Sequence, residues 1–198
     1  MNRGPAVRPR PAATVILLRG ASRGLEVLMV KRNPQVRFMG GAWVFPGGAV
    51  DRLEGRGEGS LRAAGLRELR EEAGIELEGP QALIAFSRWI TPAEVTIRFD
   101  TWFYLAAAPP GAQPRVDGRE VIEARWYQPR LALEAARRQE IMLVLPTIKH
   151  LESLNRFRTA TELIGYARGR EVRPVAPHVL GSGETARIVL PGEPGYER

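Results

Sequence analysis

The feature that most constrains this chain is the run from Arg67 to Ile75, which reads Arg-Glu-Leu-Arg-Glu-Glu-Ala-Gly-Ile. On an α-helix, Glu68, Glu71 and Glu72 stand at positions i, i+3 and i+4, so their side chains project from one face. Such like-charged pairs destabilise an isolated helix by roughly 0.2–0.5 kcal/mol each. A divalent cation bound by their oxygens would offset this repulsion, so the run predicts a helix with a metal site.

The residues around this run support a helix that faces a glycine pair. Gly47 and Gly48 end a Val-Phe-Pro-Gly-Gly sequence, and we expect a tight turn there, because glycine lets a backbone carbonyl approach a metal where a Cβ atom would obstruct it. Ser60 is the predicted N-cap of the helix, and Gly74 is the predicted left-handed residue after its end. The expected buried stripe consists of residues spaced four apart: Leu61, Gly65, Leu69 and Ala73.

Glutamates at this spacing are also typical of a solvated acidic helix face. The Phe-Pro-Gly-Gly sequence before them and Gly-Ile after them favour the metal site, and here the chain resembles the Nudix hydrolases. The signature of that family is Gly, five residues, Glu, seven residues, then Arg-Glu-apolar-x-Glu-Glu-x-Gly-apolar. The second half matches at every position, but twelve residues (55–66) separate Glu54 from Arg67, which is a five-residue insertion. The first acidic residue therefore stays open among Asp51, Glu54 and Glu58.

Three further segments resemble a narrower group, the bacterial relatives of peroxisomal coenzyme A diphosphatases. These segments are residues 38–48, Trp89-Ile-Thr-Pro92 and residues 98–103. The Leu-Leu-Thr-x-Arg run of other coenzyme A-cleaving members is absent in that form. Coenzyme A is therefore one candidate substrate among several.

The resemblance implies an α/β/α sandwich with a mixed β-sheet and a bound Mg²⁺ or Mn²⁺. The metal ligands it implies are the Gly48 carbonyl, Glu68, Glu71 and Glu72, with Arg67 holding the carboxylates in place. It also implies that water attacks a diphosphate joining a nucleoside to another group, with Glu71 and Glu72 as catalytic residues. Glu120, ahead of a later strand, is the candidate for the general base or an additional ligand; an exposed strand-end glutamate is the alternative.

Three residues are candidates for substrate binding, and for Arg32 and Arg98 an alternative role stays open. Arg32 follows the second strand and is either a phosphate contact or a solvated strand end. Trp89 is expected to stack on a nucleobase at the rim of a cleft. Arg98 and Asp100 are two residues apart on a predicted strand, so their side chains point to the same face of the sheet. They either line the cleft or pair with residues on the neighbouring strands. For His150, His178, Trp43 and Trp102 we expect structural roles.

Composition narrows the classes of function. The 198 residues carry a net charge of +7 and no cysteine, which excludes disulfides and thiol chemistry. Only two of the 29 basic residues are lysines, so 29 − 2 = 27 are arginines, scattered along the chain. The sequence has no basic amphipathic helix, aromatic RNA-binding signature or zinc-finger spacing, so attraction of a polyphosphate substrate explains this charge as well as nucleic acid does. We expect a small nucleoside diphosphate derivative as the partner and no nucleic acid. No apolar run approaches the ~20 residues of a membrane span, and we expect a cytoplasmic protein that can form a homodimer. The alternatives are a nucleotide sensor without turnover and an RNA-cap-directed enzyme.

The pattern along the chain predicts one Nudix domain over residues 12–158, after a flexible segment 1–11. A C-terminal helix and hairpin extension, residues 159–198, is expected to pack on the domain or to form a lid or dimer arm. Helices are expected at 60–73, from Leu131 onward and at 159–167. Strands are expected at residues 13–19 and 25–32, joined by a hairpin over 20–24, and at 43–45, 82–90, 95–105, 120–127, 172–180 and 186–190.

Overall fold

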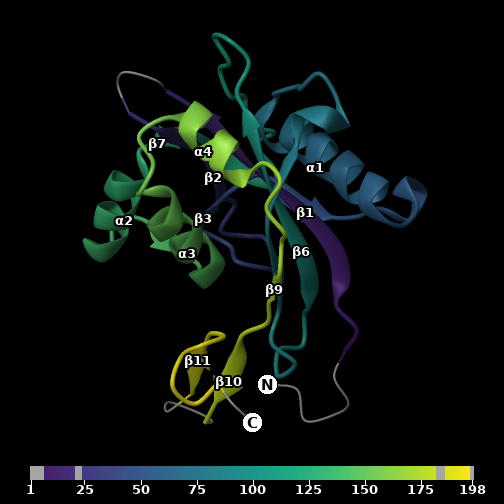
Figure 1. Ribbon diagram of the computed structural model, residues 1–198, viewed down its shortest axis with the longest axis vertical. Coiled ribbons are helices and arrows are strands. Elements are labelled where there is room, and N and C mark those ends of the chain that lie inside the picture. Colours follow the sequence, from purple (N-terminus) through teal and green to yellow (C-terminus); the bar gives the residue numbers. More distant parts are fainter. Residues whose placement is uncertain (1–6, 21–23, 182–185, 197–198) are drawn as a thin grey trace.

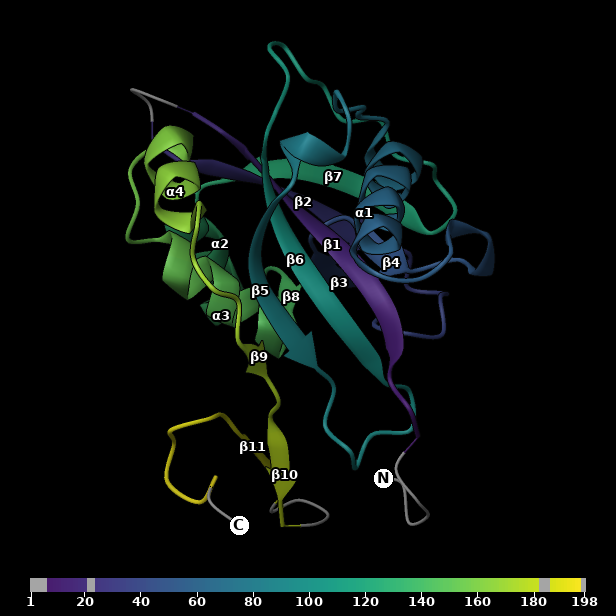
Figure 2. The ribbon, with the colours of Figure 1, turned by 45° about the vertical axis from the view of Figure 1, so that its right-hand side comes forward.

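The computed structural model describes residues 7–20, 24–181 and 186–196 of the chain. They form a mixed sheet with helices on both faces (Figure 1). Helix α1 (Glu58–Ala73) covers one face, whereas α2 (Pro129–Arg137), α3 (Leu145–Leu154) and α4 (Ala160–Ala167) cover the other (Figure 2). The predicted α/β/α sandwich is confirmed.

The sheet is centred on strand β1. Its order is β8 (Met142–Leu143), β3 (Ala42–Val44), β2 (Glu26–Arg32), β1 (Arg10–Arg19), β6 (Phe99–Ala107), β5 (Ile84–Ile90) and β9 (Pro174–Val175). In addition, β4 (Gly47–Ala49) pairs with β1, and β7 (Val121–Tyr127) pairs with β2. The β1–β6, β3–β8 and β5–β9 pairs are parallel and the others are antiparallel. Short 3₁₀ helices lie at Arg52–Glu54 and Pro80–Ala82.

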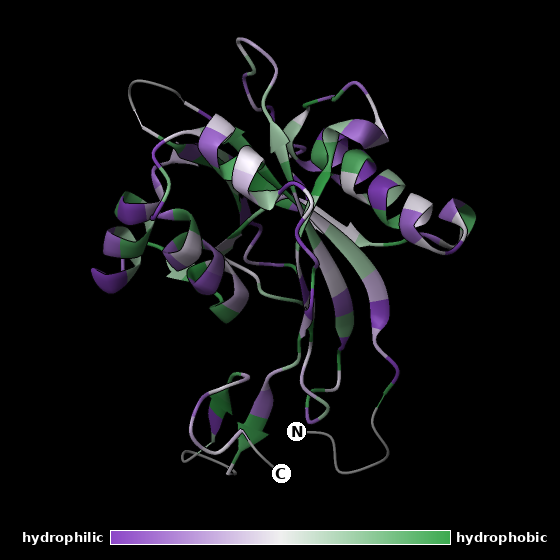
Figure 3. Ribbon diagram, in the orientation of Figure 1, coloured by the Kyte–Doolittle hydropathy of each residue, from purple (hydrophilic) through white to green (hydrophobic). Residues whose placement is uncertain are grey.

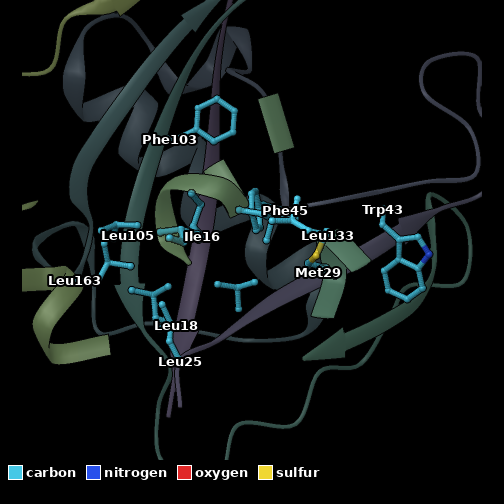
Figure 4. Close-up of a cluster of buried hydrophobic side chains, with 14 of the residues drawn as sticks. Ile16, Leu18, Leu25, Met29, Trp43, Phe45, Phe103, Leu105, Leu133 and Leu163 are labelled. Atoms are coloured by element: carbon cyan, nitrogen blue, oxygen red, sulfur yellow. The ribbon is translucent and has the colours of Figure 1, made fainter. Parts of the chain in front are cut away.

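Alternation along the strands divides the core into two clusters, because successive side chains of a strand point to opposite faces. On β1, Ile16 and Leu18 pack toward α2, α3 and α4, whereas Val15 and Leu17 pack toward α1. Figure 4 shows the first cluster, in which Leu163 of α4 also takes part. The hydrophobic residues of the strands accordingly lie between the helix layers (Figure 3). Both faces of the sheet therefore need the helices that cover them.

Helix α1 differs from the prediction at its start. It begins at Glu58, with Gly57 as the N-cap residue, and the Ser60 hydroxyl donates to the Gly57 carbonyl oxygen from inside the first turn. Ser60 is buried and does not cap the helix. At the other end the prediction is confirmed, since Gly74 has a φ of 63° and its N–H donates to the Arg70 carbonyl.

Other boundaries also differ. The glycine pair forms strand β4 and not a tight turn, and the predicted strand 95–105 begins only at Phe99, after turns and bends over residues 93–97. The predicted run 172–180 is divided into β9 and β10 (His178–Leu180), and among the described residues β10 pairs only with β11 (Arg187–Val189). The predicted flexible residues 1–6 and the loop residues 21–23 and 182–183 lie outside the described part. None of the described helices is long and apolar enough to cross a membrane.

Candidate active site

The glutamates of α1 lie against strand β4 and the end of β2. Glu72 is 3% exposed, although glutamate is rarely buried without a partner. Its carboxylate accepts a hydrogen bond of 2.9 Å from the Gly47 N–H, and its other oxygen lies 3.5 Å from Arg32 Nη1. Helix, strand β4 and strand β2 therefore meet at one buried carboxylate.

Glu68, one turn earlier, lies against the second glycine of the pair. A Cβ atom on Gly48 would be 2.5 Å from the carboxylate carbon of Glu68, which no real contact permits. Gly47 is equally constrained, since its Cβ would be 2.6 Å from Thr14 Cα on β1. Neither glycine has a positive φ. The glycine pair is therefore required for close approach and not for a turn conformation.

Arg67 forms ion pairs with three acidic residues near the contact between Gly48 and Glu68. Its guanidinium lies 2.9 Å from Glu54 Oε1, 2.9 Å from Glu68 Oε1 and 3.0 Å from Glu71 Oε2. It also donates to the Ala49 carbonyl of β4 at 3.0 Å. Of the three candidates for the first acidic residue, the structure brings Glu54 to Arg67, whereas Glu58 pairs with Arg62.

Burial is the main electrostatic influence on the two inner glutamates. It raises the pKa of Glu72 to about 8, against the hydrogen bond from Gly47, while the charge of Glu68 raises it further. Burial also raises the pKa of Glu68, against the hydrogen bond from Arg67. The charge of Glu120 raises the pKa of both carboxyls. Glu120, exposed just before β7, thus acts on the same site, and the pair would be stabilised by added positive charge.

The donor set fits a hard divalent cation. The buried carboxylate of Glu72, the partly buried carboxylate of Glu68 and a strand carbonyl without an obstructing Cβ supply oxygen ligands, which Mg²⁺ and Mn²⁺ prefer. Within the described ranges, no three acidic or histidine side chains are grouped closely enough to form a complete metal cage. Mg²⁺ in phosphate-processing sites is commonly held by one or two carboxylates together with substrate phosphates and water. The incomplete cage therefore suits a metal that binds together with its substrate.

Glu71 lies farther out than the other predicted ligands. Its side chain is 51% exposed, compared with 13% for Glu68 and 4% for Glu72, and it pairs with Arg67. Two apparently equivalent neighbours, Glu71 and Glu72, thus have different surroundings, because a helix turns by about 100° per residue. Nothing in the Glu-Glu pair alone distinguishes them.

The predicted substrate residues are placed at three different points. Arg32 is beside Glu72 and also donates to the Phe38 carbonyl, so it is not a solvated strand end. Arg98 donates to the Thr91 and Val7 carbonyls, which ties the start of β6 to neighbouring segments. Trp89 packs beside His150, with ring centroids 5.8 Å apart. Within the described part of the chain, Arg32 is the only one of these three residues whose side chain pairs with a site glutamate.

The residues with predicted structural roles mostly occupy the core. Trp43 and His150 are buried, and Trp102 is half-buried against the α1 side of the sheet. Asp100 pairs across strands with Arg88 at 2.6 Å, as one of the two alternatives for Asp100 expected. Sequence reasoning missed two features of the site, the Arg32 contact with Glu72 and the Gly47 hydrogen bond. Both join segments 25 or more residues apart, and no local pattern indicates them.

A sandwich whose crossing helix places glutamates against a glycine strand agrees with the fold and site expected for the Nudix hydrolases. The model of the NUDIX domain matches residues 8–145, and the chain belongs to this family. It is 28% identical over 207 residues to nudix hydrolase 7 of Caenorhabditis elegans, covering 86% of this chain and 68% of that protein.

Two further relatives frame the comparison. The chain is 31% identical over 122 residues to the Homo sapiens acyl-coenzyme A diphosphatase NUDT19, which covers 58% of this chain but only 32% of that protein. The crystal structure of a NUDIX hydrolase from Alicyclobacillus acidocaldarius has a TM-score of 0.71 and 27% identity, covering 80% of this chain and 96% of that chain. The chain thus spans about a third of the human relative's length.

Proposed function

We propose that this Nudix hydrolase cleaves the diphosphate linkage of a nucleoside diphosphate derivative with Mg²⁺ or Mn²⁺ bound at Glu68, Glu72 and the Gly48 carbonyl. The observation that carries the proposal is the position of the buried Glu72 and the partly buried Glu68 against a glycine strand, with raised pKa values that a cation would reverse. When bound, such a metal neutralises phosphate oxygens and lowers the pKa of a bound water.

The protein's own groups have distinct parts in this proposal. Arg67 holds Glu54, Glu68 and Glu71 in fixed positions through a planar guanidinium with several donors. The Gly47 N–H fixes the orientation of the Glu72 carboxylate. Glu120 is exposed and acts electrostatically on both inner glutamates, which suits a general base that accepts a proton from the attacking water. Glu71 supports the site as an outer ligand or through water.

For the substrate, a coenzyme A derivative is the leading proposal. It is supported by the similarity to the human acyl-coenzyme A diphosphatase over 122 residues. The decisive experiment is a product assay with Mg²⁺ or Mn²⁺ against coenzyme A, acyl-coenzyme A, NADH, ADP-ribose, dinucleoside polyphosphates and capped RNA. We expect two monophosphate products from one class of compound. Nucleotide binding without cleavage under either metal would favour the sensor, and preferential cleavage of capped RNA would favour the nucleic-acid-directed enzyme.

We also propose that the C-terminal hairpin supports a homodimer. Strands β10 and β11 form a two-stranded sheet of their own, set apart from the main sheet (Figure 1). An isolated two-stranded hairpin is marginally stable in water, so a second copy of the chain would stabilise it. Light scattering should give a dimer for the full chain and a monomer for a chain ending at Val175. The same mass per particle for both chains would contradict the dimer arm.

A further inference from the structure

A cavity of about 270 Å³ lies away from the glutamates of α1. It is open to solvent and is lined by residues of β5, α3 and α4 and by residues 170–173, which lead into β9. Figure 2 shows this stretch descending from α4 beside β5, on the side of the sheet opposite α1. None of Gly48, Arg67, Glu68 or Glu72 lines it. The proposed hydrolytic site therefore does not account for the cavity.

The lining of the cavity carries an excess of positive charge. It includes three cations, Lys149, Arg170 and Arg173, and one carboxylate, Glu171, which gives 3 − 1 = +2. Lys149 pairs with Glu152 at 3.1 Å and Arg173 with Glu171 at 3.3 Å, both at least one-third exposed. Exposed pairs of this kind contribute only ~0–1 kcal/mol. An anionic ligand can therefore replace Glu152 and Glu171 as the partner of these cations at a small cost in free energy.

The wall formed by β5 is largely aromatic. Phe86 and Trp89 both line the cavity, and their rings lie 6.0 Å and 5.8 Å from the ring of His150. Trp89 is half-buried, so part of its ring remains available to a ligand. Aromatic rings bind planar groups by offset or edge contacts. This wall suits an aromatic body attached to the anion.

Ser87 supplies a hydrogen-bond acceptor in the same cavity. His150 Nδ1 lies 2.6 Å from the Pro146 carbonyl oxygen, which can only accept, so Nδ1 carries the proton. Nε2 is then the acceptor, and it lies 2.6 Å from Ser87 Oγ, which must donate its hydrogen to it. The remaining lone pairs of Ser87 Oγ can accept from a ligand hydroxyl or amine. The cavity thus combines cations, an aromatic wall and a fixed acceptor.

We infer that this cavity binds a nucleoside monophosphate. Its phosphate would lie at Lys149, Arg170 and Arg173, its base against Phe86 and Trp89, and a hydroxyl or amine would donate to Ser87. The volume is just below the ~300–1,000 Å³ of small-molecule pockets, which suits one nucleotide and not a dinucleotide. Charge-assisted bonds from lysine and arginine are the usual way in which proteins hold such a phosphate.

The test is calorimetric titration of AMP into the full chain in EDTA, so that divalent metals play no part. We expect saturable binding that Lys149→Met and Arg170→Met each weaken by at least about tenfold. Arg138→Met, which removes another exposed cation paired with a glutamate, should leave the affinity unchanged, and so should Glu72→Gln. Absence of saturable binding, or loss of binding in Glu72→Gln alone, would overturn the inference.

Two partial ligands separate the contributions. Adenosine and inorganic phosphate should each bind at least about tenfold more weakly than AMP, because each lacks one half of the recognition. Adenosine binding as tightly as AMP would show that the cations take no part. Phosphate binding as tightly as AMP would show that the aromatic wall takes no part. Either result contradicts the proposed ligand class.

Discussion

At the scale of single residues, the site depends on the absence of one methyl group. Gly48 has an ordinary backbone conformation, yet a side chain there would overlap the carboxylate of Glu68. That carboxylate is also held by Arg67 at 2.9 Å, so it cannot move without breaking an ion pair. The observed position of the Glu68 carboxylate therefore requires glycine at residue 48.

Substitution of Gly48 tests this constraint. We expect Gly48→Ala to reduce kcat by about 10–100-fold, as displacement of a metal-site carboxylate does. The melting temperature should change little, because the overlap is with the end of a side chain and not with backbone. Steady-state kinetics and thermal unfolding measure the two effects. Full activity in Gly48→Ala would show that Glu68 is not needed at its observed position.

A second prediction at this scale concerns the buried His150. Burial lowers its pKa to about 4, so the folded protein requires the neutral ring while the unfolded chain takes up a proton near pH 6.5. Its contribution to stability is complete above about pH 6.5 and is lost as the pH falls toward 4, at up to ~1.4 kcal/mol per pH unit.

Urea unfolding between pH 7 and pH 4 measures this loss. His150→Gln is the matched variant, because a side-chain amide does not titrate but also has an N–H group that can donate to the Pro146 carbonyl and an oxygen that can accept from Ser87. The free energy of unfolding should fall less steeply with acidification in the variant than in the wild type. Equal slopes would mean that protonation of His150 makes no contribution.

At the scale of elements, α1 is where prediction from sequence succeeded best. Its 16 residues contain the glutamates, and the left-handed Gly74 follows its last residue; the local patterns of both are strong. Its N-cap was predicted three residues late, at Ser60 and not Gly57, because Ser60 is a good N-cap residue type but lies buried inside the first turn. Strand β4 was missed for a related reason: it consists of Gly47, Gly48 and Ala49, which have low strand propensity and pair only because β1 is beside them.

The first turn of α1 offers a test of its helical boundary. Gly59 lies within the helix, and a Cβ atom there would meet open space. We expect Gly59→Ala to stabilise the protein by about 0.5–1 kcal/mol, since alanine loses less backbone entropy in a helix. Chemical denaturation measures the change. A destabilised variant would indicate that residue 59 is outside the helix, as the prediction from Ser60 implied.

At the scale of the whole molecule, the sandwich and the C-terminal hairpin are separate structural units. The two core clusters lie between the sheet and its helices, and neither includes a residue of β10; Val189 of β11 is buried but also outside both clusters. The Tyr196 hydroxyl donates a hydrogen bond to the Ala176 carbonyl, and both residues belong to the C-terminal extension. The sequence predicted the strands of this extension, but no local pattern shows that β10 and β11 form a sheet of their own and do not join the main sheet.

This separation predicts that the domain is stable without the hairpin. A chain that ends at Val175 keeps β9 and all four helices, so its melting temperature at low protein concentration should be within a few degrees of the full chain's. Differential scanning calorimetry provides the comparison. A drop of more than about 8 °C would show that the hairpin packs on the domain and is not an independent arm.

The central claim is that the buried Glu72, held by Gly47, belongs to a metal site that hydrolyses diphosphates. The most direct measurement is kcat for the best substrate with Mg²⁺ in Glu72→Gln and in Glu76→Gln, which makes the same charge change at an exposed position just beyond the helix. We predict a loss of at least about 100-fold for Glu72→Gln and less than about twofold for Glu76→Gln, with both proteins folded. Wild-type turnover by Glu72→Gln would contradict the assignment of the active site.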